Sequence, residues 1–208
     1  TVTTKVVAMS LPNKDGVLQS GGLRLMGAGD ANLSGRTIPY VSPALRPNPA
    51  PPEADPLRYL EEMADQVAKT GLKVVQGDIV GDDSLFPWQP YPEDWSIDDT
   101  VWGYGAPISA LTVNDNEMKV TVNPATEAGV PATAAIEQAV PYYTVESSVT
   151  TTAANTMPAV GIDRALGSKV VRVYGTVPVG IVPMTSQISI DAPAEDAAYL
   201  TAVFTTLM

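Results

Sequence analysis

The chain has 208 residues, of which 45% are hydrophobic and 17% charged, so it is long enough for one large domain or two small ones. Its formal net charge of −11 would repel phosphate backbones and anionic membrane surfaces, which argues against nucleic acid as a partner. The absence of cysteine and histidine excludes Cys/His zinc sites, cysteine nucleophiles and Ser-His-Asp triads. No cofactor is expected, and the sequence has no run of about 18 apolar residues that could span a bilayer.

The first quarter of the chain favours strands joined by turns and loops. Residues 1–9 and 17–26 are rich in aliphatic and β-branched side chains and are predicted strands, with a turn between them at 12–16. A glycine-rich loop follows at 27–34. Residues 39–56 hold seven prolines, which predicts a long, exposed loop because proline is excluded from helix interiors and central strands.

A helix is predicted over 56–69, with Asp55 as its N-cap. Its apolar face consists of residues three or four apart: Leu57, Leu60, Met63 (or Ala64) and Val67. The helix ends in Lys-Thr-Gly, a triplet that also occurs in the active sites of penicillin-binding enzymes and class A β-lactamases. Lys69 suits the negative end of the helix dipole, and Gly71 suits a left-handed position after the last turn. Because no Ser-x-x-Lys occurs in the chain, the triplet is interpreted as a helix terminus.

The remaining elements are mostly strands. Runs rich in threonine and valine, separated by turns rich in asparagine, proline and glycine, predict strands at 72–80, 107–113, 117–123, 141–152, 169–177 and 180–190. Residues 193–208 predict a final helix with one apolar face: Ala197, Leu200, Phe204 and Leu207. Runs of strands rather than alternating strands and helices indicate an α+β, β-rich fold with mostly antiparallel sheets and two or three helices.

Acidic and aromatic residues gather between positions 82 and 104. The acidic ones are Asp82, Asp83, Glu93, Asp94, Asp98 and Asp99, and the aromatic ones are Phe86, Trp88, Tyr91, Trp95, Trp102 and Tyr104. The alternating carboxylates and turn glycine of a calcium loop are absent, so no metal site is predicted. Two interpretations stay open: a pocket for a cationic or amphipathic ligand, and a solvated acidic loop whose aromatic side chains pack like a lid.

Four segments resemble those of one protein family, in the same order along the chain. Gly77–Phe86 resembles a G-x-x-x-x-D-D-S-x-F strand and turn, and Tyr104–Asn116 is similar to a Y-x-A-x-x-S-A-L-x-x-N-x-N segment. Gly22–Leu33 resembles D-L-x-L-x-G-x-G-D-P-x-L, with Ala31 where proline is usual, and Val171–Pro178 resembles v-x-G-x-x-P. The family is that of the class C penicillin-binding proteins of the D-alanyl-D-alanine carboxypeptidase/endopeptidase type, and the resemblance runs nearly the whole length of the chain.

The resemblance implies a domain organisation. In that family Ser-x-x-Lys precedes a large insertion into the penicillin-binding domain, and S-x-N and K-T-G follow it. This chain resembles the insertion alone, and we expect a fragment because it lacks an initiator methionine and stops within a helical pattern. The implied domains are an accessory α+β domain over 1–105 and 178–208 and a nested all-β domain over 106–177, with the catalytic penicillin-binding domain absent.

The resemblance also implies a substrate site. In some members the insertion supplies an aspartate and, five residues later, an aromatic residue, which bind the free amino end of the diamino acid in the peptidoglycan stem peptide. This spacing selects Asp99 and Tyr104. The tryptophan that some members carry three residues before the aspartate would fall at Ser96, so Trp95 fits only with a shift of one residue, and Asp98 then competes with Asp99. A carboxylate attracts an ammonium group, and an aromatic face covers its methylene stem.

The implied function is that of a fragment of a serine-type D-Ala-D-Ala carboxypeptidase/endopeptidase, which is acylated by β-lactams through a serine activated by lysine. The fragment would give substrate recognition and scaffolding and would be inactive alone. Its partner would be the peptidoglycan stem peptide, bound together with the missing catalytic domain, in the periplasm or elsewhere outside the cytoplasm in the bacterial cell envelope. Two alternatives stay open: a stand-alone acidic, β-rich binding or surface domain without catalysis, and a pseudo-enzyme whose parent has lost the serine.

Overall fold

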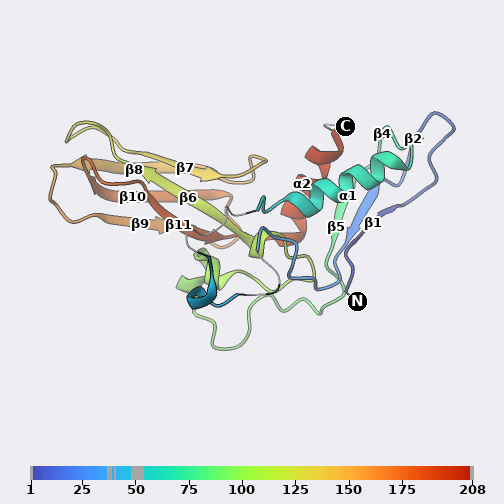
Figure 1. The fold of residues 1–208 in the computed structure, drawn as a ribbon, viewed down its shortest axis with the longest axis horizontal. Helices are drawn as coiled ribbons and strands as arrows, with labels where there is room; N and C mark the ends of the chain where they lie inside the picture. The colour runs from blue at the N-terminus through green and yellow to red at the C-terminus, as the bar shows by residue number, and fades with distance from the viewer. Residues whose placement is uncertain (1, 37–38, 40, 48–53, 207–208) are drawn as a thin grey trace. The chain divides into compact units, whose positions relative to one another are not determined.

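The computed structural model describes residues 2–36, 39, 41–47 and 54–206. The chain divides into two compact units. Unit 1 consists of Thr1–Pro90, Ile108–Asp115 and Ala192–Met208, and unit 2 of Tyr91–Pro107 and Asn116–Asp191. Among the described residues, unit 1 contains one three-stranded sheet and both α-helices, and unit 2 contains two three-stranded sheets (Figure 1). The predicted α+β, β-rich fold class is confirmed.

Unit 1 combines a small mixed sheet with two helices. Strands β1 (Lys5–Ala8), β3 (Leu23–Met26) and β5 (Ile79–Asp82) form the sheet in the order β1-β3-β5, antiparallel and then parallel. Two shorter strands, β2 (Val17–Leu18) and β4 (Val74–Val75), pair in parallel. Helix α2 packs against β5, and α1 packs against α2 (Figure 1). Leu18, Leu23 and Leu25 are fully buried in this unit.

Glycines divide two of the predicted strands in unit 1. The predicted strand at 17–26 appears as β2 and β3, separated by Gly21 and Gly22, whose φ angles are +82° and +76°. The predicted strand at 72–80 appears as β4 and β5, separated near Gly77. A Cβ atom on Gly22 would lie 1.8 Å from the carbonyl oxygen of Asp78. The two interruptions therefore face each other across the sheet, where the backbones come too close for any other residue.

The first helix has the predicted terminus but a slightly later start. Helix α1 spans Arg58–Lys69, and the side chain of Asp55 accepts a hydrogen bond of 2.8 Å from the Leu57 backbone amide just before it. Gly71 has the expected left-handed φ of +86°. Lys-Thr-Gly is therefore a helix terminus, as predicted. In the predicted proline loop, residues 40 and 48–53 lie outside the described residues, and the described part contains a short 3₁₀ turn η1 (Pro43–Leu45).

Helix α2 spans Pro193–Thr206, close to the predicted range. Ala197 and Leu200 of its predicted apolar face are buried. The side chains of Phe204 and Leu207 lie outside the part of the chain that is described. Much earlier in the chain, at the junction of the two units in the sequence, the 3₁₀ turn η4 (Asn114–Asn116) has a positive φ at all three residues. Asparagine and aspartate adopt this conformation more readily than most residues.

Unit 2 is built from two three-stranded sheets. Strands β11 (Met184–Ser189), β6 (Glu117–Asn123) and β7 (Thr133–Glu137) form an antiparallel sheet in that order. Strand β10 (Val170–Pro178) is the centre of the second sheet. It pairs in parallel with β8 (Thr144–Thr152) and antiparallel with β9 (Ala159–Asp163).

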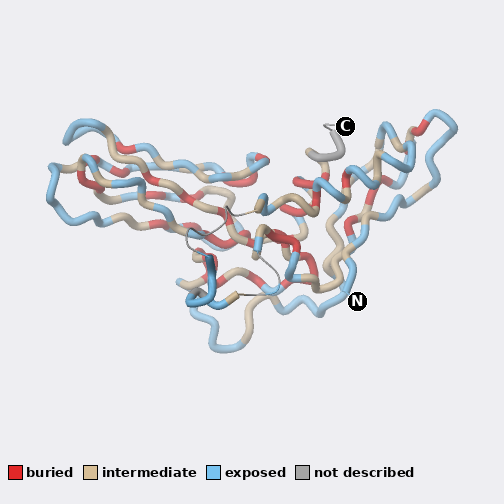
Figure 2. The backbone as a smooth tube through the Cα atoms, viewed as in Figure 1, coloured by how far each residue is buried: buried red, intermediate tan, exposed pale blue. Residues whose placement is uncertain are grey.

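The core of unit 2 follows from residue alternation along these strands. In β6, Met118, Val120 and Val122 are buried and alternate with half-buried polar neighbours. In β10, Val171, Val173 and Val177 are fully buried, and the buried positions run along the strands in Figure 2. Because successive side chains of a strand point to opposite faces, this pattern places one face in the core.

Several details differ from the predictions. In unit 2, β7 and β9 were not predicted, and residues 107–113, of which 108–113 lie in unit 1, do not form a strand. Strand β11 and the residues on either side of it, 178–191, lie in unit 2. The family resemblance implied that 178–208 belong to the accessory α+β domain together with 1–105. Residues 91–107 also lie in unit 2 rather than with 1–90. β11 belongs with this unit because six of its residues pair with β6.

Candidate functional site

Three of the four predicted site residues, Asp98, Asp99 and Tyr104, lie in two successive 3₁₀ turns of unit 2, and Trp95 lies two residues before the first turn. The two turns are η2 (Ile97–Val101) and η3 (Gly103–Gly105). The backbone amide of Trp102 donates a 2.9 Å hydrogen bond to the carbonyl of Asp99, and that of Gly105 donates one of 2.9 Å to the carbonyl of Trp102. A Cβ atom on Gly105 would lie 2.0 Å from the Asp99 carbonyl oxygen. Glycine at 105 therefore lets the chain fold back on Asp99.

This fold brings Asp99 and Tyr104 together. The phenol of Tyr104 donates a 2.9 Å hydrogen bond to Asp99 Oδ1, and the Tyr104 side chain is 70% exposed. This hydrogen bond, together with the negative charge of the carboxylate, raises the pKa of Tyr104 above its usual value. Asp99 makes no salt bridge with a described lysine or arginine, so the pair presents a carboxylate and an aromatic face to solvent without an internal counter-ion.

The other two predicted site residues lie in the same segment but are held differently. Ser96 Oγ donates to Asp98 Oδ1, and this hydrogen bond lowers the pKa of Asp98 below its usual value. Trp95 is 38% exposed. Among the described residues, no ring contact or side-chain hydrogen bond joins Trp95 or Asp98 to the Asp99–Tyr104 pair. Of the predicted site residues, the structure therefore brings Asp99 and Tyr104, which are five residues apart, into direct contact.

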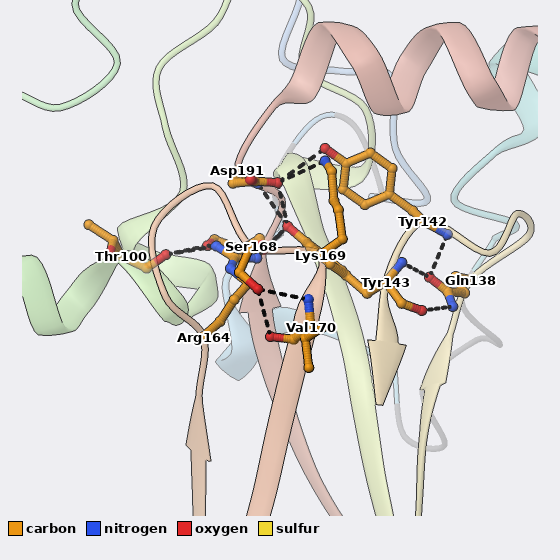
Figure 3. A network of polar contacts seen from close by, with 10 residues as sticks. Thr100, Gln138, Tyr142, Tyr143, Arg164, Ser168, Lys169, Val170 and Asp191 are labelled. Carbon is orange, nitrogen blue, oxygen red and sulfur yellow. Dashed lines mark hydrogen bonds and ion pairs between the residues drawn. The ribbon is translucent and has the colours of Figure 1, made fainter. Parts of the chain in front are cut away.

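A buried arginine lies beneath this segment. Arg164 is 7% exposed, and its Nη2 atom donates to the carbonyl of Thr100 at 3.2 Å and to Ser189 Oγ at 2.9 Å (Figure 3). Its Nη1 atom donates to the Tyr143 hydroxyl and to the Ser189 carbonyl. The guanidinium carbon lies 4.8 Å from the centre of the Tyr143 ring. A buried guanidinium needs such partners because an unpaired buried charge is strongly destabilising.

Asp191 completes this cluster from the other side. Asp191 Oδ1 accepts hydrogen bonds from the Tyr142 and Tyr143 hydroxyls at 3.1 and 2.8 Å, and it lies 3.3 Å from Lys169 Nζ (Figure 3). Burial alone would raise the pKa of Asp191, but the Tyr143 hydrogen bond and the charges of Lys169 and Arg164 outweigh it, so the pKa is lowered. Burial, as the largest cause, raises the pKa of Tyr143. We call Thr100, Tyr142, Tyr143, Arg164, Lys169, Ser189 and Asp191 the Arg164 network.

No sequence pattern predicted this network. Its members are scattered along the chain, and Arg164 and Thr100 are 64 positions apart. Local periodicity carries no information on such a pairing. One local signal was present: the adjacent pair Tyr142 and Tyr143 lies at the start of the predicted strand at 141–152, and both side chains are buried just before β8. Buried tyrosines require hydroxyl partners, so the pair indicated polar groups inside this unit.

Unit 1 offers no comparable cluster of predicted residues. A shallow hollow there is lined by Thr4, Asp30, Tyr59, Glu62 and others, none of which was predicted to bind substrate. Within the described ranges, no group of three or more acidic side chains is arranged to hold a metal ion. No helix among the described residues is long and apolar enough to cross a membrane.

Comparisons with known proteins decide the family. The model of the D-Ala-D-Ala carboxypeptidase 3 (S13) family matches residues 1–205. The chain belongs to this family. A D-alanyl-D-alanine carboxypeptidase from Actinomadura sp. (strain R39) is 32% identical over 203 residues, which are 95% of this chain and 33% of that protein. This chain therefore spans about a third of the length of that relative.

Solved structures of penicillin binding protein 4 (dacB) from Haemophilus influenzae share the fold of this S13-family chain. One has a TM-score of 0.71 at 17% identity and covers 99% of this chain and 41% of its own. A second, in complex with a β-lactam, has a TM-score of 0.62 at 15% identity and covers 99% and 39%. The resemblance stated from the four sequence segments is thus confirmed at the level of family and fold.

Proposed function

We propose that this chain is the accessory part of a serine-type D-Ala-D-Ala carboxypeptidase/endopeptidase acting on peptidoglycan stem peptides. The acyl-enzyme chemistry would take place on a serine activated by lysine in a catalytic domain outside this chain. Three observations support this: membership of the S13 family, coverage of about a third of the Actinomadura relative, and the absence of Ser-x-x-Lys and S-x-N from the sequence. The chain would supply substrate recognition and scaffolding outside the cytoplasm, in the cell envelope.

The recognition site in this proposal is the Asp99–Tyr104 pair. The observation that carries it is the 2.9 Å hydrogen bond between an exposed phenol and a carboxylate that has no salt bridge to a described cation. A substrate ammonium group would provide the missing counter-charge, and the Tyr104 ring would cover the methylene groups behind it. Trp95 and Asp98, in the same segment, would extend the apolar and acidic character of the site.

Turnover of two matched stem peptides tests this site in the full-length protein that carries this chain. One peptide ends in a free amino group on its diamino acid, and in the other that amine is acetylated. Asp99→Asn removes the negative charge but keeps the shape, so kcat/KM for the free-amine peptide should fall by about 5- to 150-fold, equivalent to about 1–3 kcal/mol. The acetylated peptide should lose much less.

A matched control is Asp163→Asn, which changes an exposed aspartate of β9 in the same unit. It should leave the preference for the free amine unchanged. An equal loss on both peptides in Asp99→Asn would reject Asp99 as the partner of the amine.

The location of the nucleophile has its own test. Incubated with a β-lactam, this chain alone should show no covalent mass increase, because it lacks the Ser-x-x-Lys motif. A stoichiometric adduct would contradict a nucleophile outside the chain. Sequencing the flanking coding DNA separates this proposal from a free-standing binding domain: Ser-x-x-Lys upstream, with S-x-N and K-T-G downstream, is expected.

A further inference from the structure

We infer that Arg164 is a positioning residue for substrate recognition, which holds Asp99 in place by binding the backbone carbonyl of Thr100. The inference rests on the function proposed above for Asp99 and Tyr104. It adds a residue that is distant in sequence, buried, and unable to touch the substrate itself.

Thr100 is held by hydrogen bonds from side chains in the interior of unit 2. Its carbonyl oxygen accepts two hydrogen bonds, from Arg164 Nη2 at 3.2 Å and from Ser189 Oγ. Its own hydroxyl donates to the Ile97 carbonyl at 2.6 Å. Thr100 is buried, whereas the neighbouring Asp99 is half-buried with its carboxylate bonded to exposed Tyr104. The peptide group between Thr100 and Val101, one residue after Asp99, is therefore fixed from the interior of unit 2.

Arg164 is itself fixed in place. Its two terminal nitrogens bond four acceptor atoms on three residues: Thr100, Tyr143 and Ser189. The Tyr143 hydroxyl is in turn bonded to the carboxylate and the backbone amide of Asp191. A lysine has one compact ammonium group and cannot reproduce this planar, forked arrangement. The requirement at position 164 is thus for a guanidinium and not only for a positive charge.

Strand β11 supports the segment at 97–105. The segment at 97–105 lies against this strand: both 3₁₀ turns contact it, and Trp102 forms an isolated antiparallel bridge with Ile188. Ser189, the next residue of β11, supplies the second donor to Thr100. The two side-chain donors to the Thr100 carbonyl therefore add to the backbone hydrogen bonds of the 3₁₀ turns and tie the segment to β11 and Arg164.

The competing interpretation is that Arg164 only stabilises unit 2. Stability alone does not distinguish the two, because breaking a buried ionic cluster destabilises in either case. The distinguishing readouts are the order of the 97–105 segment and the preference for the free amine. A merely structural residue changes the midpoint of unfolding but leaves both unchanged in the folded population.

The test uses Arg164→Lys and Ser189→Ala in the full-length protein that carries this chain. Amide hydrogen exchange at Trp102 and Gly105, whose N–H groups bond within the segment, should speed up by about tenfold, while the β10 amides stay protected. The preference in kcat/KM for the free-amine peptide over the acetylated one should fall by about 3- to 30-fold, through KM, with kcat on the acetylated peptide nearly unchanged.

The matched control is Arg172→Lys, a substitution of the same type in the same unit. Arg172 is 63% exposed and forms a surface ion pair of 3.4 Å with Glu146. It should change neither the exchange rates nor the preference. Should Arg164→Lys fail to fold, Ser189→Ala, which removes a single donor to the Thr100 carbonyl, carries the test.

The outcomes separate this inference from the proposed function. In one outcome, Arg164→Lys and Ser189→Ala keep the wild-type exchange at 97–105 and the wild-type preference, while Asp99→Asn loses the preference. This outcome would overturn the role of Arg164 and leave the function of Asp99 intact. A wild-type preference in Asp99→Asn itself would overturn the proposed function and the inference together. Faster exchange with an unchanged preference would show that Arg164 orders the segment without positioning Asp99 for the amine, and would overturn the inference.

Discussion

The two units hold their irregular segments by different means. In unit 1 the interruptions at Gly21–Gly22 and Gly77 are set by close backbone approach, and side-chain hydrogen bonds are mostly local, such as that from Ser84 to Asp82 at 2.6 Å. In unit 2 the irregular segment at 97–105 is held by a buried arginine from a distant part of the chain. The comparison indicates that the segment proposed for recognition has an anchor that local turn chemistry does not provide.

Loss of an arginine should affect the two units very differently. Arg164→Met removes the four hydrogen bonds that the buried guanidinium donates to Thr100, Tyr143 and Ser189, and should destabilise the protein by about 3–5 kcal/mol. Arg24→Met in unit 1 removes an ion pair of 3.3 Å with Asp82, in which the arginine side chain is 40% exposed, and should cost about 1 kcal/mol or less. Urea unfolding of both variants measures the difference; similar losses would break the comparison.

Close backbone approach should make the substitution of Gly22 in unit 1 costly. Gly22→Ala places a Cβ atom 1.8 Å from the Asp78 carbonyl oxygen at a φ of +76°, and should cost about 3 kcal/mol. Gly180→Ala in unit 2 has a similar φ of +79° but no atom within 4 Å, so only the left-handed strain of about 1–2 kcal/mol is expected. Thermal unfolding of the two variants separates steric clash from strain, and equal shifts in Tm would contradict the assignment.

The hydroxyl of Tyr104 should contribute less than the carboxylate beside it. Tyr104→Phe keeps the aromatic face but removes the 2.9 Å hydrogen bond to Asp99, so the preference for the free-amine peptide should fall by about 2- to 10-fold, or about 0.5–1.5 kcal/mol. Tyr174→Phe, at another exposed tyrosine of unit 2, is the control. Should the two variants behave alike in steady-state kinetics, the hydrogen bond plays no part in recognition.

The smallest effect should appear in the dependence of stability on pH. The pKa of Asp191 is lowered in the folded state, so its ionised carboxylate stabilises the fold. This contribution to the free energy of unfolding is complete above the usual pKa of 3.8 and is lost as the pH falls through the lowered pKa. Because the pKa of Tyr143 is raised, its contribution is complete below the usual value of 10.0 and is lost as the pH rises through the raised one.

Asp191→Asn should therefore flatten the acid side of the stability profile. Unfolding midpoints at pH 6 and below pH 3.8 measure this, and the decrease between the two should be smaller in the variant than in the wild type. An unchanged decrease would mean that other carboxylates dominate the acid response. Asp163→Asn, which alters an exposed aspartate outside the Arg164 network, should retain the full decrease.

Regular elements were predictable from sequence because their signals are local. The run rich in valine and threonine predicted a strand at 117–123, the observed bounds of β6, and Lys69 with Gly71 marked the end of α1. The interruptions at Gly22 and Gly77 were missed because they depend on two backbones meeting across a sheet. The contact between Asp99 and Tyr104 spans five residues and followed from the family resemblance. Arg164 has partners 21 to 64 positions away, which no local pattern indicates.

The measurement that tests the account most directly is a double-mutant cycle of Asp99→Asn and Arg164→Lys in the full-length protein. The quantity compared is the ratio of kcat/KM for the free-amine and acetylated peptides. If Arg164 acts through Asp99, Arg164→Lys reduces this ratio in the wild type but causes no further reduction in Asp99→Asn. Fully additive reductions would show that Arg164 and Asp99 act independently and would contradict the account.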